Sequence, residues 1–338
     1  MPISPVTISV AFVHGLLSGV CAGGVPPESW LLKAGIAPAL LDEPAARVTA
    51  EQYVALFRVL VAARNDEGLG FFSRQLRRGT FELLMRSAMG AATVDAAARH
   101  FCQGFGLMQD DMRFEGVKQG ALSGMRIVPA TDQFAAQVFV HELLLRLLAR
   151  FTAWLHGGRL RPHGYDFAYP IPRQASEYGK VFSGQVRFDQ PCSVIWFNAE
   201  KLQVPVRRDE AALLDFLARS PGTLIVPRRH DEATSQRVRA YLQQGRPHWP
   251  DLAAAAGALH MSVSTLQRRL ADEHSSFQAI KDQLRRDLAI MRLNTSSVPM
   301  LELAGELGFS DQAAFQRAFK AWTGSAPGTY RQNQNLEP

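Results

Sequence analysis

Two stretches near the C-terminus carry glutamine and arginine at a spacing that suits hydrogen bonding to base edges. In the stretch 309–324, helical spacing places apolar residues on one face and leaves a polar face opposite. Arginine can donate two hydrogen bonds to guanine, glutamine can pair with adenine, and a small side chain lets a helix approach a thymine methyl. The alternative is an ordinary solvated helix face. The polar face consists of Gln312, Ala313, Gln316 and Arg317, with Lys320 beside them.

The same arrangement occurs earlier in the chain, as an internal repeat. The triplet 266–268 (Leu-Gln-Arg) recurs as 315–317 (Phe-Gln-Arg), and each copy has a short helix, a turn near a glycine and a second helix. This layout is typical of a helix-turn-helix, whose second helix enters the major groove. Two matched copies favour base contact over a merely solvated face. In the first copy the outward residues are Val263, Ser264, Gln267 and Arg268.

One long amphipathic helix is predicted between the copies, at about 276–294. Its apolar stripe is Phe277, Ile280, Leu284, Leu288 and Met291. An amphipathic helix of about 17 residues is about 25 Å long and could hold two recognition helices about one DNA turn, roughly 34 Å, apart. Its arginines serve either phosphates or solvation; we assign Arg286, with Lys320, to phosphate contacts. The two units flanking it are expected at about 250–272 and 298–322.

The stretch LGFSDQAAFQRAFKAWTGSAPGTYR, residues 307–331, resembles the signature of the AraC/XylS family of bacterial transcription regulators. The stretch 261–273, MSVSTLQRRLADE, resembles that family's first recognition helix. The resemblance implies base contacts from the outward positions of both helices. Ser264 stands where some members have a larger aromatic residue, which weakens its expected contribution. The implied contact residues are Ser264, Gln267 and Arg268, then Gln312, Ala313 and Arg317.

Two further stretches, 30–60 and 167–206, resemble the arabinose-binding-like sensor domain of the subfamily close to the ornithine-utilisation regulator. The resemblance implies a transcription regulator that binds double-stranded promoter DNA, responds to a small-molecule effector and recruits RNA polymerase as an activator. It also implies a homodimer. The rival interpretation keeps DNA binding but makes the N-terminal domain a protein-interaction and dimerisation module without a small ligand.

The pattern of predicted elements indicates an α+β domain followed by an all-α domain. We expect the sensing and dimerisation domain at 1–220, a linker at 221–231, rich in proline and charge, and the DNA-binding domain at 232–338. Two strands are predicted around a turn in 111–130, and further strands in 162–198. A single helix is predicted over 132–156 and is our choice for the dimer interface, with a buried core helix as the alternative.

Local signals predict where several helices begin. Thr49 with Gln52 forms a capping-box pattern, Thr93 is a second expected N-cap, and Ser310 is expected to cap the last recognition helix. The apolar run 6–24 faintly resembles a signal peptide, but no Lys or Arg precedes it. A buried first helix is the better interpretation.

An aromatic and sulfur-rich cluster lies near the first predicted strand and is our candidate effector pocket, with ordinary core as the alternative. An arginine on the neighbouring strand is assigned to an effector carboxylate. The candidate residues are Phe101, Phe105, Met108, Met112 and Arg126.

Composition and the remaining motifs argue against other classes. The 338 residues suit two or three domains, 47% are hydrophobic, and the formal net charge of +6 suits a polyanionic partner. The three cysteines form no disulfide or zinc pattern, so we expect a cytoplasmic protein. His141-Glu142 begins an HExxH pattern, but Leu145 ends it. We therefore expect no enzyme activity, no metal, no cofactor and no membrane span.

Overall fold

The computed structural model describes residues 6–22, 24–158, 160–218, 234–273 and 275–331. The expected linker at 221–231 lies outside these residues. The chain divides into two compact units. One unit combines residues 11–30 with 54–227, and the other combines 1–10 and 31–53 with 228–338. This grouping differs from the sequential division expected at 220 and 232, because two N-terminal segments join the C-terminal helices.

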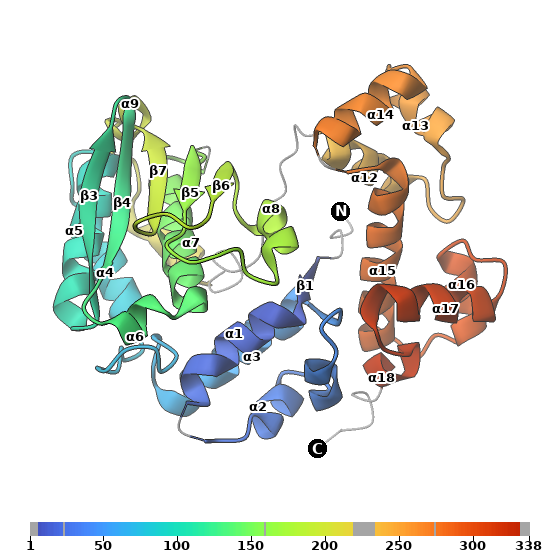
Figure 1. Ribbon diagram of the computed structural model, residues 1–338, viewed down its shortest axis with the longest axis horizontal. Coiled ribbons are helices and arrows are strands. Elements are labelled where there is room, and N and C mark those ends of the chain that lie inside the picture. Colours follow the sequence, from blue (N-terminus) through green and yellow to red (C-terminus); the bar gives the residue numbers. More distant parts are fainter. Residues whose placement is uncertain (1–5, 23, 159, 219–233, 274, 332–338) are drawn as a thin grey trace. The chain divides into compact units, whose positions relative to one another are not determined.

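The unit built from 11–30 and 54–227 contains a five-stranded sheet in the order β3-β4-β7-β5-β6. The first two strands form an antiparallel hairpin that turns at Gly120, whose φ of 56° favours glycine. The predicted strand pair is therefore confirmed. Helices α5 and α7 cover one face of the sheet (Figure 1). The bounds are β3 (Met112–Gln119), β4 (Leu122–Pro129), β5 (Gly164–Asp166), β6 (Gln185–Arg187), β7 (Val194–Asn198), α5 (Val94–Met108) and α7 (Val138–Leu155).

Further helices complete this unit, and the first one is confirmed as buried. On α1, the predicted inward positions Phe12, Leu16, Leu17 and Val20 are all at most 6% exposed. Thr93 caps α5 as expected, accepting a hydrogen bond of 3.2 Å from the Ala96 amide. The helices are α1 (Val10–Val20), α4 (Thr80–Ala88), α8 (Tyr178–Val181), α9 (Ala199–Leu202) and α10 (Glu210–Ala218). The unit boundaries fall within α2 (Glu28–Lys33) and α3 (Ala50–Arg64), and the unit holds the first half of α2 and most of α3.

The single helix predicted over 132–156 is wrong, because the structure has two helices there. A short helix α6 (Asp132–Ala135) is capped by Thr131, and α7 starts only at Val138. Gln137 lies between them in a non-helical conformation, with φ −83° and ψ 84°. Every residue of α7 is buried or half-buried. That burial favours a core helix over a dimer interface.

The unit that contains the C-terminal helices also contains a two-stranded ribbon. Strands β1 (Thr7–Ser9) and β2 (Arg47–Thr49) pair antiparallel, with Thr7 opposite Thr49. The capping box after β2 is confirmed, since the Thr49 and Gln52 side chains each accept a hydrogen bond from the other residue's amide. The helices are α12 (Thr234–Gln244), α13 (Leu252–Ala258), α14 (Val263–Asp272), α15 (Phe277–Thr295), α16 (Met300–Glu306), α17 (Gln312–Thr323) and α18 (Pro327–Arg331).

Side-chain caps fix the starts of both recognition helices. Ser262 caps α14 by accepting from the Thr265 amide at 3.2 Å. The cap of α17 is Asp311, which accepts from the Ala314 amide at 2.7 Å, so the expected cap Ser310 is wrong by one residue. Ser310 instead donates to the Asp311 carboxylate. Hydrogen bonds from Ala314 and Ser310 lower the pKa of Asp311, so this cap is charged at neutral pH.

Candidate nucleic-acid interface

Helices α13–α14 and α16–α17 each form a helix-turn-helix around matched buried residues. Leu266 and Leu270 of α14 are fully buried, as are Phe315 and Phe319 at the matching positions of α17. The first helix of each pair contributes an alanine with no exposed surface, Ala255 in one and Ala304 in the other. The repeat seen in the sequence is therefore a repeat of packing, and it orients both recognition helices by the same face.

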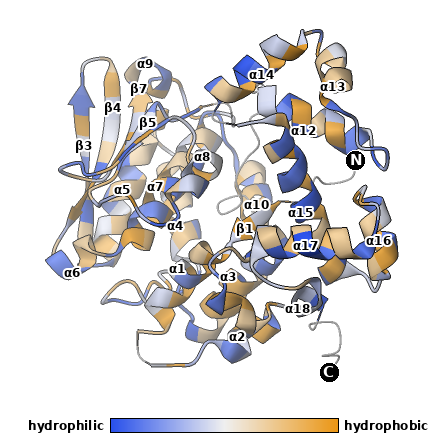
Figure 2. Cartoon of the chain, turned by 45° about the vertical axis from the view of Figure 1, so that its right-hand side comes forward, coloured by the Kyte–Doolittle hydropathy of each residue, from blue (hydrophilic) through white to orange (hydrophobic). Residues whose placement is uncertain are grey.

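The residues predicted to contact bases all lie on the opposite, exposed faces. Figure 2 shows hydrophilic positions on α14 and α17, the helices that carry them. Lys320, assigned to phosphate, is also exposed, one turn after Gln316 on α17. The structure thus leaves every predicted base-contacting residue available to a ligand. These residues are Ser264, Gln267 and Arg268 on α14, and Gln312, Ala313, Gln316 and Arg317 on α17.

The connecting helix α15 is fastened to the N-terminal helix-turn-helix through a lysine. The Lys281 ammonium donates to two carbonyl oxygens, those of Trp249 at 3.2 Å and Pro250 at 3.3 Å. These residues directly precede Asp251, the N-cap of α13. The position of the first helix-turn-helix is therefore tied to one face of α15.

Two arginines fasten α15 to the second helix-turn-helix. The Arg285 guanidinium lies 5.0 Å from the ring centres of both Trp249 and Phe309, and it donates to the Gly308 carbonyl in the turn between α16 and α17. Arg292 forms a two-pronged ion pair with Glu306 at the end of α16, with distances of 2.6 and 3.0 Å. Lys281, Arg285 and Arg292 thus hold both helix-turn-helix motifs against the single helix α15.

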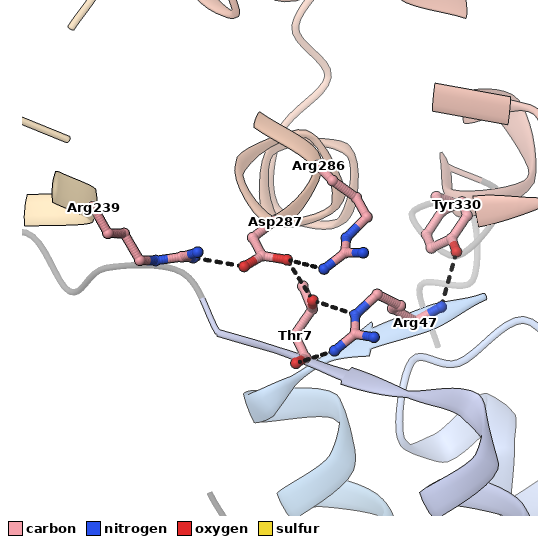
Figure 3. Close-up of polar contacts among 6 residues, drawn as sticks. All are labelled: Thr7, Arg47, Arg239, Arg286, Asp287 and Tyr330. Carbon is pink, nitrogen blue, oxygen red and sulfur yellow. Dashed lines mark hydrogen bonds and ion pairs between the residues drawn. The ribbon is translucent and has the colours of Figure 1, made fainter. Parts of the chain in front are cut away.

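A buried cluster fastens the N-terminal ribbon to the same helix (Figure 3). The Asp287 carboxylate of α15 accepts a hydrogen bond from the Thr7 hydroxyl at 2.6 Å and pairs with Arg239 of α12 at 2.6 Å. Arg286 pairs with the same carboxylate at 3.3 Å. Thr7 also accepts from the Arg47 guanidinium at 2.8 Å. We call Thr7, Arg47, Arg239, Arg286 and Asp287 the Asp287 cluster.

The charges in the Asp287 cluster offset the cost of burying a carboxylate. Burial alone would raise the pKa of Asp287, but the positive charges of Arg286, Arg239 and Arg47 outweigh it and lower that pKa. Arg47 extends the connection, since its backbone amide donates to the Tyr330 hydroxyl of α18 at 3.2 Å. The ribbon is therefore hydrogen-bonded to α15 through Thr7 and to α18 through Arg47.

Arg286, assigned from sequence to a phosphate contact, has a side chain only 14% exposed. Its guanidinium contacts the buried Asp287 carboxylate, so the side chain lies inside the unit and not on an exposed face of α15. Arg285 and Arg292 are likewise engaged within the protein. Lys320 is the candidate phosphate contact that the structure leaves exposed.

The residues that position α15 were not predicted from the sequence, although one signal was present. Asp287 falls on the apolar stripe of the helix, one position before Leu288, where a carboxylate needs a partner. Thr7 and Arg47 gave no comparable signal, because they lie far from Asp287 in sequence. Trp249, which also donates to the Glu306 carbonyl at 3.0 Å, was missed as well.

The candidate effector residues do not gather around one site. Phe101, Phe105 and Met112 are at most 5% exposed, and the Phe101 ring packs 4.6 Å from that of Phe151 on α7. Met108 is half-buried. Arg126 on β4 pairs with Glu115 on β3. Of the five, Phe105 lines a cavity, a largely apolar one of about 710 Å³ beside α3, α4 and α7.

Comparison with protein families places these features in a known group. Residues 24–206, more than half of the chain, match the model of the arabinose-binding domain of AraC transcription regulators, N-terminal part. Residues 255–333, which include both recognition helices, match a helix-turn-helix domain. The chain belongs to the AraC family of DNA-binding transcription regulators. None of the described helices of this AraC-family protein is long and apolar enough to cross a membrane.

Individual relatives are regulators too. The ornithine utilization regulator of Pseudomonas aeruginosa is 28% identical over 326 residues, which cover 96% of each chain. The regulator VirS of Mycobacterium tuberculosis is 36% identical over 192 residues, or 56% of each chain. The crystal structure of the regulator CdpR from Pseudomonas aeruginosa is 19% identical, covers 96% of this chain and 98% of its own, and has a TM-score of 0.32.

Proposed function

We propose that this AraC-family regulator contacts two successive major-groove half-sites, one through α14 and the other through α17. The observation that carries the proposal is that seven polar or small residues are exposed on two helices fastened to one connecting helix. Arginine and glutamine at these positions can pair with guanine and adenine edges. Because α14 and α17 differ in sequence, the two half-sites are unlike each other.

The regulator acts in the cytoplasm as a homodimer that binds a small-molecule effector through its N-terminal domain. It then recruits RNA polymerase to nearby promoters as an activator. Two cavities of about 700 and 710 Å³ support a small ligand over a purely protein-binding module, since both have the size of ligand pockets. A thermal shift of the full-length protein with candidate metabolites separates these two interpretations.

Genome-wide mapping of bound DNA, followed by footprinting of the bound sites, tests the proposal. The expected footprint covers two major grooves on one face of the duplex, about 10 base pairs apart. Protection confined to one groove contradicts two-helix binding. The same experiments identify the neighbouring genes, whose products indicate the effector's metabolism.

The salt dependence of binding separates phosphate contacts from structural arginines. Replacing the exposed Lys320 by alanine should reduce the slope of log K against log salt by about 1. Arg286→Ala should leave that slope unchanged, because Arg286 is engaged by Asp287 inside the unit. Equal slopes for both variants contradict the assignment of Lys320 to a phosphate.

A further inference from the structure

A cavity of about 700 Å³ opens beside α1 in the sheet-containing unit. We call it the α1 cavity. Its walls come from α1, the loop that follows Gly70, the segment from Thr131 and the start of α7. Its size falls within the range of small-molecule pockets. Representative lining residues are Ser18, Phe71, Asp111, Gln137, Phe139 and Gln174.

Two glycines of α1 allow these walls to approach the helix closely. A Cβ atom at Gly15 would lie 2.1 Å from the Phe139 ring, and one at Gly19 would lie 2.3 Å from the Leu69 carbonyl oxygen. Any larger residue would push Phe139 or the loop at 69–71 away from α1. The shape of the cavity therefore depends on having glycine, with no side chain, at positions 15 and 19 of α1.

The charges around the α1 cavity have one sign. Asp111 is a lining residue, and the described lining residues include His14 but no lysine or arginine. The Asp111 carboxylate accepts from the amide and hydroxyl of Ser73, which fixes its position while one oxygen remains for a ligand. An anionic ligand would meet the Asp111 carboxylate and neither a guanidinium nor an ammonium group among the described lining residues, whereas a cation would find an acceptor.

A second carboxyl group, that of Glu142, accepts a hydrogen bond from a residue in the cavity wall. Gln174 lines the cavity and donates its amide nitrogen to Glu142 at 3.1 Å, so its amide oxygen is the polar atom left for a ligand. Glu142 is 3% exposed, and its other carboxyl oxygen is buried without a hydrogen-bond partner among the described residues. Burial raises the pKa of Glu142 to about 7, so this carboxyl is only partly charged at neutral pH and the preference for a cation depends mainly on Asp111.

Four phenylalanines supply aromatic faces to the same cavity. The rings of Phe71 and Phe139 lie 5.8 Å apart, and those of Phe72 and Phe134 lie 5.6 Å apart. The negative face of an aromatic ring attracts an ammonium or guanidinium group, and its apolar area packs against the carbon chain attached to it. The apolar cavity beside α3 differs, because its lining residues carry both signs of charge, Arg58 and Arg78 with Glu67 and Glu82.

We propose that the α1 cavity binds a small organic cation, an amine or guanidine with an attached carbon chain, as the effector of this regulator. Asp111 and the Gln174 amide oxygen accept hydrogen bonds from the cationic group, and the paired phenylalanines enclose the chain. This proposal deepens the proposed function and depends on it for the role of the ligand as effector.

Calorimetric titration of the full-length protein tests the proposal with n-butylamine and benzylamine as probes. Butyrate and 1-butanol, of similar size, serve as anionic and neutral controls. The amines should bind at least about ten-fold more tightly than either control. Equal or tighter binding of butyrate or butanol, or no heat from any amine, overturns the proposal.

Matched variants test the location. Asp111→Asn keeps an acceptor for Ser73 and should weaken amine binding about ten-fold. The neighbouring carboxylate Asp110, which pairs with Arg74 and does not line the cavity, provides the control Asp110→Asn, which should stay within about two-fold. Ser18→Trp should abolish binding by filling the cavity, while Ser18→Ala should not. Equal losses in the two Asp variants overturn the assignment.

Operator binding is measured by fluorescence anisotropy in the same samples. If the wild-type protein binds its operator but no amine binds, the cavity proposal fails and the regulator assignment stands. If the amines bind as expected but sequence-specific DNA binding is absent, the proposed function fails while the cation site remains. The two results are therefore distinguishable.

Discussion

At the residue scale, Arg268 and Arg317 occupy matched exposed positions on the two recognition helices. Replacing either by alanine should cost about 1–3 kcal/mol of binding free energy and relax base preference at one half-site, a different one for each variant. Binding to a panel of operators with single base changes measures this. An Arg317→Ala protein that keeps the wild-type preference at every position, with unchanged circular dichroism, contradicts base contact by α17.

Glu142 predicts a pH dependence of stability. Burial raises its pKa from 4.5 to about 7, although hydrogen bonds from Tyr178 and Gln174 and the charge of Arg146 act against that rise. Between these two values the folded protein binds more protons than the unfolded chain, so stability falls as pH rises from about 4.5 to about 7. The loss is on the order of 3 kcal/mol and is complete above the folded-state pKa.

Glu142→Gln should remove this loss, because the amide stays neutral at every pH. Thermal unfolding of both proteins between pH 5 and pH 8, in steps of about half a unit, measures the difference. The melting temperature of the wild type, relative to the variant, should decline up to about pH 7 and then stay level. A constant difference across this range would show that Glu142 does not titrate there.

At the scale of elements, α15 depends on partners from both ends of the chain. Asp287→Asn should cost about 3–5 kcal/mol, because it leaves Arg239 and Arg286 buried without their carboxylate. Thr7→Val removes the hydrogen bond to that carboxylate and the hydroxyl acceptor of the Arg47 guanidinium, and it should cost less, about 1–3 kcal/mol, because no charge is lost. Thermal unfolding and binding to operators with one or two intact half-sites measure both effects.

Binding to operators with one or two intact half-sites shows whether the ribbon positions α15 for DNA. If the ribbon positions α15 for DNA, Thr7→Val should weaken binding to the two-site operator more than binding to a single half-site. Thr7→Ser, which keeps the hydroxyl, should restore two-site binding. A Thr7→Val protein as stable and as tightly bound to the operator as the wild type would contradict any role for the ribbon.

Periodicity and capping predicted the elements that are determined locally. Both recognition helices, α15 and the β3–β4 hairpin lie where the sequence placed them, because their apolar spacing and turn residues act within a few positions. The split between α6 and α7 was not visible, since Gln137 has no strong local preference against a helix. Asp311 replaced Ser310 as a cap because both are good caps and stand side by side.

At the scale of the whole molecule, the exposed face proposed to contact bases could be predicted from the sequence. That the N-terminal ribbon belongs to the same unit as the C-terminal helices could not. Outward glutamines and arginines follow from helical spacing alone. The ribbon consists of two three-residue strands, too short to show alternation, and its pairing joins residues about 40 positions apart. Its contact with α15 is longer in range still, with 280 positions between Thr7 and Asp287. Sequence pattern carries no information at that separation.

The spacing of half-sites tests whether α15 acts as a rigid rod. It has 19 residues and is therefore about 28 Å long, and it is fastened near one end by Lys281 and further along by Arg285 and Arg292. Inserting five base pairs between the half-sites rotates one of them to the opposite face of the duplex. Inserting ten restores the face but moves that half-site about 34 Å further away.

A flexible connection would tolerate the ten-base-pair insertion, whereas a rigid one would tolerate neither. We expect both insertions to reduce affinity to that of an operator with one half-site scrambled, a loss of about 100-fold. Gel-shift titrations of the full-length protein on the four operators at one salt concentration measure this. The side chains of Lys281, Arg285 and Arg292 hold α15 to the two helix-turn-helix units through charge-assisted hydrogen bonds and arginine–aromatic contacts. Because Arg292→Ala removes one of these contacts, it should partly recover binding to the ten-base-pair insertion. Wild-type affinity for that operator would show that α15 does not set the spacing.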